Sequence, residues 1–255
     1  LAMAERFARE GMKLVLADIE AGPLAAAEAR LRAAGAEVVS RRTDVMSGAE
    51  VDALADAAYA AFGAVHVLCN NAGVAAPALR TRAWECPSGD WDWIMGVNFG
   101  GVLNGVRSFV PRMLSGGDEG HVVNTASIAG LLTGSNPYFV SKHAVTCLTE
   151  GLYKDFRAIG AKLSASVLCP GIIRTGILDA ERNRPTQFGA GTDVSRLAPD
   201  VRAQAATFRA ALNAGTDPAD QLIAAELCWC AHSGSSAGSL PTTHPLVSIH
   251  HPPPR

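Results

Sequence analysis

The sequence predicts an α/β fold, in which a doubly wound parallel sheet is covered by helices on both faces, giving three α/β/α layers. Short apolar runs rich in Val and Leu alternate strictly with longer segments whose apolar residues recur every three or four positions. Such alternation is typical of parallel sheets, because each crossover needs a helix that packs back onto the sheet. With 255 residues, 48% of them hydrophobic, the chain can form one large domain with a sizeable core.

Caps and glycines mark the predicted helices. Gly11 and Gly35 end the first two, while Ser47 and Glu50 form a capping box that opens the third, which Gly63 closes. The predicted helices span residues 1–10, 23–34, 48–62, 88–114 and 137–159.

The fourth predicted helix carries an unusual residue. Ser88 or Asp90 is expected to cap it, and Asn98 lies in its middle. Since asparagine is a weak helix former, Asn98 is expected to bond a backbone group or a water molecule.

The predicted strands span residues 12–17, 37–41, 65–69, 121–125 and 163–168. Polar or glycine residues follow each of them: Asp18, Asp44 and Val45, Asn71 to Gly73, Ser127, and Pro170 and Gly171. The carboxyl ends of parallel strands share one edge of the sheet, where ligands bind in open α/β folds. The sequence therefore predicts a binding site at this edge.

These residues also have purely structural interpretations. Asp44 could be a helix cap, and the run from Asn70 to Gly73 could be a simple turn. Asp18 is more specific, because a carboxylate at that strand end of a dinucleotide fold can accept both adenosine ribose hydroxyls and repels a 2′-phosphate.

A serine, a tyrosine and a lysine lie close together in the sequence. Tyr138 and Lys142 are four residues apart on a predicted helix, so they share one face. A nearby ammonium favours the phenolate, so Lys142 is expected to lower the pKa of Tyr138 from about 10 and make it a proton acceptor. Ser127 could hold a substrate oxygen beside the phenol. Taken alone, the Tyr138–Lys142 pair could be an ordinary surface pair.

Composition excludes several classes of function. The net charge of −2 and the pI of about 6.4 favour neither nucleic acid nor an anionic membrane surface as partner. No apolar run approaches the ~18 residues of a membrane span. The six cysteines are scattered, which indicates reduced thiols and a cytoplasmic location.

Taken together, these residues resemble the short-chain dehydrogenase/reductase family. The matching positions occur in the family's order over residues 1–178: Asp18, Asp44-Val45, Asn70-Asn71-Ala72-Gly73, Asn98, Ser127, Tyr138-x-x-x-Lys142 and the run from Pro170 to Thr175. Each motif is weak alone, but the ordered set is highly specific. The resemblance implies a Rossmann sheet, a nicotinamide dinucleotide and hydride transfer at a carbinol carbon.

The resemblance also implies roles for individual residues. Tyr138 would be the general base in oxidation, Lys142 would lower its pKa and bond the nicotinamide ribose, Ser127 would orient the substrate, and Asn98 would hold a water of a proton relay. No metal is needed, because the cofactor and proton transfer supply the chemistry. The implied cofactor is NAD, bound by Asp18, Asp44, Val45, Asn71, Ala72, Gly73, Tyr138, Lys142, Pro170, Gly171, Ile173 and Thr175.

The family's glycine-rich loop, Thr-Gly-x-x-x-Gly-x-Gly, and the strand before it do not occur in the sequence. That strand would be central, so an open slot is expected between the strands 12–17 and 65–69, and NAD binding is expected to be weak. A fragment or mis-started gene is favoured over a defective protein.

The C-terminal part departs further from the family. Residues 1–230 are expected to form the single dehydrogenase domain, with 177–215 as a substrate lid whose arginines lie mainly on a solvated helix face. Residues 231–255 are expected to be a disordered, low-complexity tail without a further strand, in which His244, His250 and His251 bind no metal.

The expected function is hydride transfer between NAD(H) and a secondary alcohol or ketone. Apolar residues near the site, such as Leu131 and Phe139, favour a small hydrophobic substrate. A catalytically inactive remnant of such an enzyme is the main alternative, and epimerase or dehydratase chemistry is a weaker one. The resemblance implies a homodimer or homotetramer that assembles through the two long helices.

Overall fold

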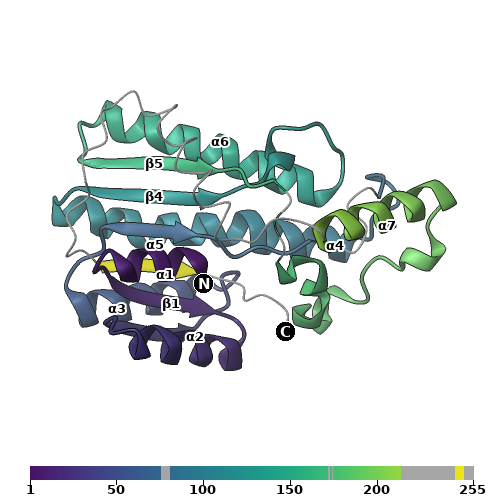
Figure 1. The fold of residues 1–255 in the computed structure, drawn as a ribbon. Helices are drawn as coiled ribbons and strands as arrows, with labels where there is room; N and C mark the ends of the chain where they lie inside the picture. The colour runs from purple at the N-terminus through teal and green to yellow at the C-terminus, as the bar shows by residue number, and fades with distance from the viewer. Residues whose placement is uncertain (76–80, 172, 174, 214–244, 250–255) are drawn as a thin grey trace.

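Six parallel strands form one sheet with helices on both faces (Figure 1). The structure is a computed structural model and describes residues 1–75, 81–171, 173, 175–213 and 245–249. The strands are β1 (Lys13–Asp18), β2 (Val38–Arg42), β3 (Val67–Asn70), β4 (Gly120–Thr125), β5 (Leu163–Leu168) and β6 (Pro245–Ile249), in the spatial order β2-β1-β6-β3-β4-β5. The predicted α/β fold class is confirmed.

Apolar cores on both faces hold the helices against the sheet. The helices are α1 (Ala2–Arg9), α2 (Ala21–Ala33), α3 (Gly48–Phe62), α4 (Ser88–Met95), α5 (Gly101–Gly116), α6 (Pro137–Ala158) and α7 (Pro199–Asn213). One core packs α1 and α2 on Leu14 and Leu16 of β1, and another packs α3, α5 and α6 on the opposite face. The sheet is therefore buried between two helical layers, as its Val-rich and Leu-rich strands predict.

The predicted capping signals are present where the sequence placed them. Ser47 accepts a hydrogen bond from the Glu50 backbone amide at 3.3 Å, and Gly63 ends α3 with a φ of 78°. Gly11 and Gly35, with φ of 78° and 89°, follow α1 and α2. These left-handed positions suit glycine because it has no Cβ.

Strand β6 fills the position between β1 and β3 that the sequence predicted to be an open slot. It pairs in parallel with β1 on one side and β3 on the other. The prediction of a disordered tail is therefore wrong for Pro245–Ile249. This segment forms backbone hydrogen bonds with strands on both sides, and these partners cannot be recognised from the sequence of the tail alone. The rest of the predicted tail, with His244, His250 and His251, lies outside the described residues.

The predicted long fourth helix is divided into three parts. Between α4 and α5 lies a π-helical turn, η1 (Gly96–Gly100), at whose centre Asn98 is buried. The expected capping of this helix is wrong, because Pro87 is its N-cap residue and no side chain caps it. Asp90, one of the two residues expected to cap it, is instead buried against the segment that follows β5.

That segment is the predicted substrate lid. It contains three 3₁₀ turns, η3 (Gly176–Asn183), η4 (Thr186–Phe188) and η5 (Val194–Arg196), followed by α7, and lies beyond the carboxyl ends of the strands (Figure 1). The backbone of η4 packs on α4 so closely that a Cβ at Gly89 would lie 2.0 Å from the Phe188 carbonyl oxygen. The lid is therefore docked on α4.

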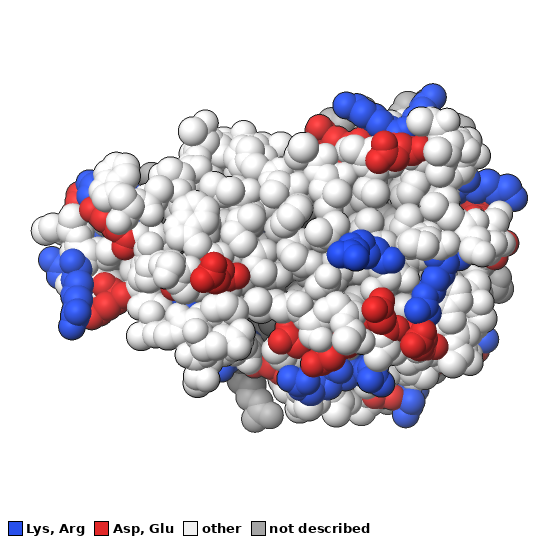
Figure 2. Space-filling view, turned by 180° about the vertical axis from the view of Figure 1, so that it is seen from behind, with Lys and Arg blue, Asp and Glu red and all other residues white. Residues whose placement is uncertain are grey.

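The outer surface of the α3, α5 and α6 layer is sparsely charged. Figure 2 shows a broad uncharged area at its centre, with charged side chains gathered mainly towards both ends. Among the described residues, no helix is long and apolar enough to cross a membrane.

Candidate active site

The four predicted catalytic residues lie on segments that meet at the carboxyl edge of the sheet. Ser127 follows β4 and starts the short turn η2 (Ile128–Gly130), Tyr138 and Lys142 lie near the start of α6, and Asn98 lies in η1. Helix α6 packs against both η1 and η2. The fold therefore brings these four residues, which are spread over the sequence, into one region.

The Lys142 ammonium is buried beside the phenol ring. Its side chain is only 3% exposed, and Nζ donates a hydrogen bond to the Thr125 carbonyl oxygen at 3.0 Å. Nζ lies 5.7 Å from the centroid of the Tyr138 ring. Burial lowers the pKa of Lys142 from 10.5 to about 8, because desolvation disfavours the charged amine. At neutral pH the group is still mainly a cation.

Burial acts on Tyr138 in the opposite direction to the prediction. It raises the pKa of the phenol above 10, and a hydrogen bond with the Ser127 side chain partly opposes the rise. The net shift of this pKa is therefore upward, because the desolvation of the phenolate outweighs the hydrogen bond from Ser127. Ser127 Oγ also accepts a hydrogen bond from the Ala129 amide at 3.1 Å, which fixes its position.

Asn98 is bonded to the backbone, as its position in the middle of a helix predicts. Its amide accepts a hydrogen bond from Val74 N at 2.8 Å and donates one to Val74 O at 3.0 Å. It also donates to Ser141 Oγ at 3.0 Å, on α6. The asparagine therefore links η1, the segment after β3 and the helix that carries Tyr138 and Lys142.

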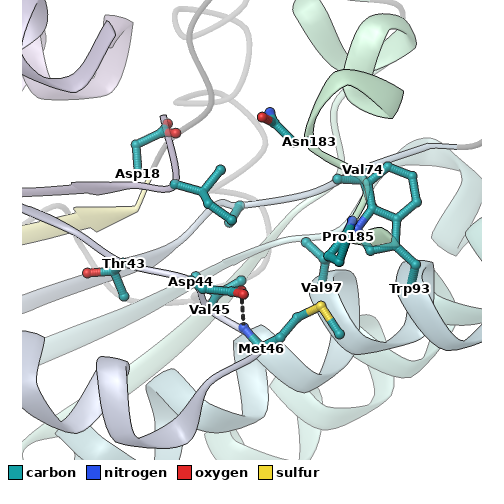
Figure 3. Close-up of a pocket in the computed structure, with 12 residues that line it drawn as sticks. Asp18, Thr43, Asp44, Val45, Met46, Val74, Trp93, Val97, Asn183 and Pro185 are labelled. Atoms are coloured by element: carbon teal, nitrogen blue, oxygen red, sulfur yellow. Dashed lines mark hydrogen bonds between the residues drawn. The ribbon is translucent and has the colours of Figure 1, made fainter. Parts of the chain in front are cut away.

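Four of the predicted cofactor residues line a single pocket (Figure 3). They are Asp18 at the end of β1, Asp44 and Val45 after β2, and Ala72 after β3. Asp18 is 3% exposed, and an Asp44 carboxylate oxygen accepts a hydrogen bond from the Met46 amide at 2.9 Å. This pocket therefore combines apolar walls with two carboxyl groups.

Asn71 and Gly73 lie between this pocket and the predicted catalytic residues. Asn71 Oδ1 accepts a hydrogen bond from Thr125 Oγ1 at 3.0 Å. A Cβ at Gly73 would lie 3.4 Å from both Asn98 Oδ1 and Lys142 Nζ, so any larger residue would crowd the two polar groups.

The remaining predicted cofactor residues follow β5. The Pro170 carbonyl oxygen accepts a hydrogen bond from the Ile128 amide at 2.9 Å, which joins this segment to the turn after Ser127. Gly171 is exposed and Ile173 is half-buried, and the Thr175 hydroxyl caps η3 by accepting a hydrogen bond from the Ile177 amide at 3.4 Å.

Comparison with known proteins identifies the family. Residues 1–186 match the family described as short chain dehydrogenase. The chain belongs to the short-chain dehydrogenase family. A short-chain dehydrogenase/reductase from Burkholderia phymatum, solved in complex with NAD, is 44% identical and has a TM-score of 0.81, with 96% of this chain and 83% of that chain covered.

Curated relatives of this short-chain dehydrogenase include two bacterial enzymes. One is the CLA biosynthesis dehydrogenase/reductase of Lactiplantibacillus plantarum, 35% identical over 75% of this chain and 66% of that protein. The other is the 1-deoxy-11-beta-hydroxypentalenate dehydrogenase of Streptomyces exfoliatus, 36% identical over 79% of this chain and 72% of that protein. The chain spans about two thirds of the length of these relatives.

Other residues that line the pocket of this short-chain dehydrogenase were not predicted. They are Ile19, Thr43, Met46, Val74, Trp93, Val97, Asn183 and Pro185. The residues next to predicted ones could have been found from their neighbours in the sequence. Asn183 and Pro185 come from the lid and belong to no motif, so nothing in the sequence connects them with the pocket.

A buried ion pair joins the lid of the short-chain dehydrogenase to α4. Arg184 pairs with Asp90, and their side chains are 6% and 0% exposed. Asp90 also accepts a hydrogen bond from Thr192 Oγ1 at 2.5 Å, and the Arg184 guanidinium stacks 4.5 Å from the centroid of the Trp93 ring. The prediction that the lid arginines lie on a solvated face is therefore wrong for Arg184.

Proposed function

We propose that this short-chain dehydrogenase transfers a hydride between NAD(H) and a secondary alcohol or ketone. The observation that supports this most directly is the burial of the Lys142 ammonium beside Tyr138, with Ser127 hydrogen-bonded to the phenol. Burying a cation costs free energy, so a protein retains one at such a position when the charge is used.

In oxidation, Tyr138 accepts the proton of the substrate hydroxyl, and in reduction it returns that proton to the carbonyl oxygen. Ser127 keeps the substrate oxygen within reach, because its own position is fixed by hydrogen bonds to the Ala129 amide and the phenol. The positive charge of Lys142 stabilises the phenolate that forms when Tyr138 loses its proton. General acid–base catalysis of this kind typically contributes about 10²–10⁴-fold in rate.

Asn98 is proposed to fix the backbone around the site and to support a water-mediated proton relay to Lys142. Its amide is committed to Val74 and Ser141, so it fixes the backbone on both sides of the cluster. The lack of a side chain at Gly73 keeps Asn98 Oδ1 and Lys142 Nζ uncrowded.

NAD is the proposed cofactor, and when bound it supplies the hydride acceptor or donor. The pocket fits its adenosine half, since Asp18 presents a carboxylate to ribose hydroxyls and disfavours a 2′-phosphate. Asp44 and Val45 are proposed to flank adenine, and Ala72 to lie below the ribose. The relative from Burkholderia phymatum was solved with NAD, which supports this choice.

The nicotinamide end is proposed to bind near the segment after β5. Ile173 and Thr175 would hold its carboxamide, and Pro170 and Gly171 would set the direction of that segment. Asn71 and Gly73 would pass beneath the nicotinamide-side ribose, next to Lys142.

The substrate is proposed to be a small hydrophobic molecule. Ile128, Leu131 and Leu132 follow Ser127 directly and are 47%, 61% and 51% exposed. An apolar surface next to the catalytic serine favours an alcohol or ketone with an apolar body.

A homodimer or homotetramer is proposed, formed through the layer that contains α5 and α6. The uncharged centre of this surface (Figure 2) supports the assignment, because the centres of protein interfaces are depleted of charge. Light scattering after size-exclusion chromatography tests it, and a monomer at micromolar concentration would contradict it. Four free cysteines in the described part of the chain, Cys69, Cys86, Cys147 and Cys169, support the proposed cytoplasmic location.

A catalytically inactive relative is the second candidate. The position between β1 and β3, which the family's central strand before the glycine-rich loop would take, is filled by β6. Calorimetric titration with NAD, followed by turnover assays over a panel of secondary alcohols, separates the two candidates. Binding with turnover supports the enzyme, whereas a folded chain without either supports the inactive relative.

A further inference from the structure

The lid contributes a buried hydrogen-bond donor to the pocket. Asn183 Nδ2 is shielded from solvent, and no group in the described part of the chain accepts a hydrogen bond from it. In Figure 3 its amide lies at the same end of the pocket as the Asp18 carboxylate. A buried donor without an acceptor is unfavourable, and such donors in native proteins call for an explanation, such as a ligand.

The two neighbours of Asn183 anchor the lid in opposite directions. Arg182 makes a two-pronged ion pair with Glu20, with N–O distances of 2.7 and 2.9 Å, close to the end of β1. Arg184 points to α4, where it pairs with buried Asp90. Asn183 is therefore held between two fixed points, which suits a residue that must present its amide at a defined position.

We propose that Asn183 Nδ2 donates a hydrogen bond to an oxygen of the adenosine half of the dinucleotide, and that Arg182 and Arg184 position it for this contact. This inference rests on the proposed function. When it is ionised, the Asp18 carboxylate accepts hydrogen bonds but cannot donate them, so it suits ribose hydroxyls. An amide donor suits a ribose or phosphate oxygen. The two groups thus serve different atoms of one ligand.

The test compares Asn183→Leu with the wild-type chain in calorimetric titrations with NAD, ADP-ribose, AMP and adenosine. Leucine has a similar volume but no donor. We expect the dissociation constant of NAD to rise about 3- to 12-fold if the acceptor is a ribose oxygen, and more than about 12-fold if it is a phosphate oxygen. A loss already seen with adenosine identifies the ribose, and a loss that first appears with AMP or ADP-ribose identifies a phosphate.

Gln187→Leu is the matched control, because Gln187 is an exposed amide on the same lid. Its dissociation constants should stay within about twofold of the wild type. The melting temperature of ligand-free Asn183→Leu should not fall, since leucine removes an unpartnered donor. If the amide had a purely structural role, its removal would lower the melting temperature of the ligand-free chain.

Equal affinity of wild type and Asn183→Leu for all four ligands would overturn the inference and leave the proposed function intact. Absence of any binding to the wild-type chain, even at millimolar ligand, would overturn both. The two failures are therefore distinguishable.

Discussion

The proposed catalytic cluster and the lid side of the pocket are assembled in different ways. Ser127, Tyr138 and Lys142 lie within one short stretch, and their region is held mainly by hydrogen bonds to backbone groups, such as those of Thr125 and Val74. The lid is held by charged side chains from distant parts of the chain, with Arg184 on Asp90 and Arg182 on Glu20.

This difference indicates that proton transfer and enclosure of the ligand depend on separate sets of contacts. Backbone groups fix the proposed catalytic side chains at the carboxyl edge of the sheet, so their geometry depends little on the lid. Ion pairs between separate segments fix the lid, so single substitutions can release it without disturbing the proton-transfer groups. Chemistry and enclosure of the ligand should therefore respond to different mutations.

Tyr138→Phe should give the largest effect, a loss of oxidation rate without a loss of stability. Removing the hydroxyl removes the proposed general base, so the rate of NAD-dependent alcohol oxidation should fall about 10²–10⁴-fold while the melting temperature changes little. Steady-state assays measure the rate, and Tyr153→Phe, on the same helix, is the control. A rate within about twofold of the wild type would show that Tyr138 is not the base.

Asp90→Asn should release the lid. The substitution removes one of the two carboxylates that pair with buried Arg184, the other being Glu181, so the free energy of unfolding should fall by about 2 kcal/mol, and the lid should become sensitive to proteases. Asp193→Asn, which affects the exposed pair with Arg196, should leave both readouts unchanged. Protease resistance equal to that of the wild type would argue against the ion pair as the lid's anchor.

Lys142→Met should abolish oxidation yet stabilise the fold. Burial penalises the charged amine, so its loss should raise the free energy of unfolding at pH 7 by about 2 kcal/mol, after allowance for the hydrogen bond to Thr125. Between pH 8 and 10.5 the unfolded wild type binds this proton while the folded one has released it, so wild-type stability should rise with pH.

Urea unfolding at several pH values measures the effect, and Lys154→Met on the same helix serves as the control. If the stability difference between wild type and Lys142→Met stayed constant over this pH window, the lowered pKa of Lys142 would be refuted.

Glu20→Gln should give the smallest effect. Its pair with Arg182 is partly exposed, with side chains 38% and 17% exposed, so the loss of stability should be about 0.5 kcal/mol. The affinity for NAD should fall about twofold, because Asn183 would be held less firmly. Chemical unfolding and calorimetry measure the two quantities, and Glu10→Gln, in an exposed pair with Arg6, provides the comparison. An affinity loss as large as that of Asn183→Leu would mean that Glu20 itself contacts the ligand.

The sequence predicted the frame of the molecule well. Apolar runs, caps and glycines gave the order of strands and helices, since these depend on local patterns such as the Ser47 capping box and the Gly63 helix end. The predicted cofactor residues Asp18, Asp44, Val45 and Ala72 do share one pocket, because parallel strands place their carboxyl ends at one edge.

What escaped prediction depends on contacts between distant segments. The Tyr138 pKa reflects burial, which no spacing in the sequence reveals. The Asp90–Arg184 pair joins two residues far apart in the sequence, each of which alone indicates a cap or a surface charge. Asn183 lines the pocket between two arginines that pair with residues far away in the sequence.

The position of β6 has a consequence for how the protein folds. While the chain is being synthesised, β1 and β2 can form one block and β3, β4 and β5 another, but these blocks pair with each other only through β6. The join must therefore wait until Pro245–Ile249 has left the ribosome. Closing so long a loop is slow, because its entropic cost precedes the gain from strand pairing. The sheet should thus be completed last at its middle rather than at an edge.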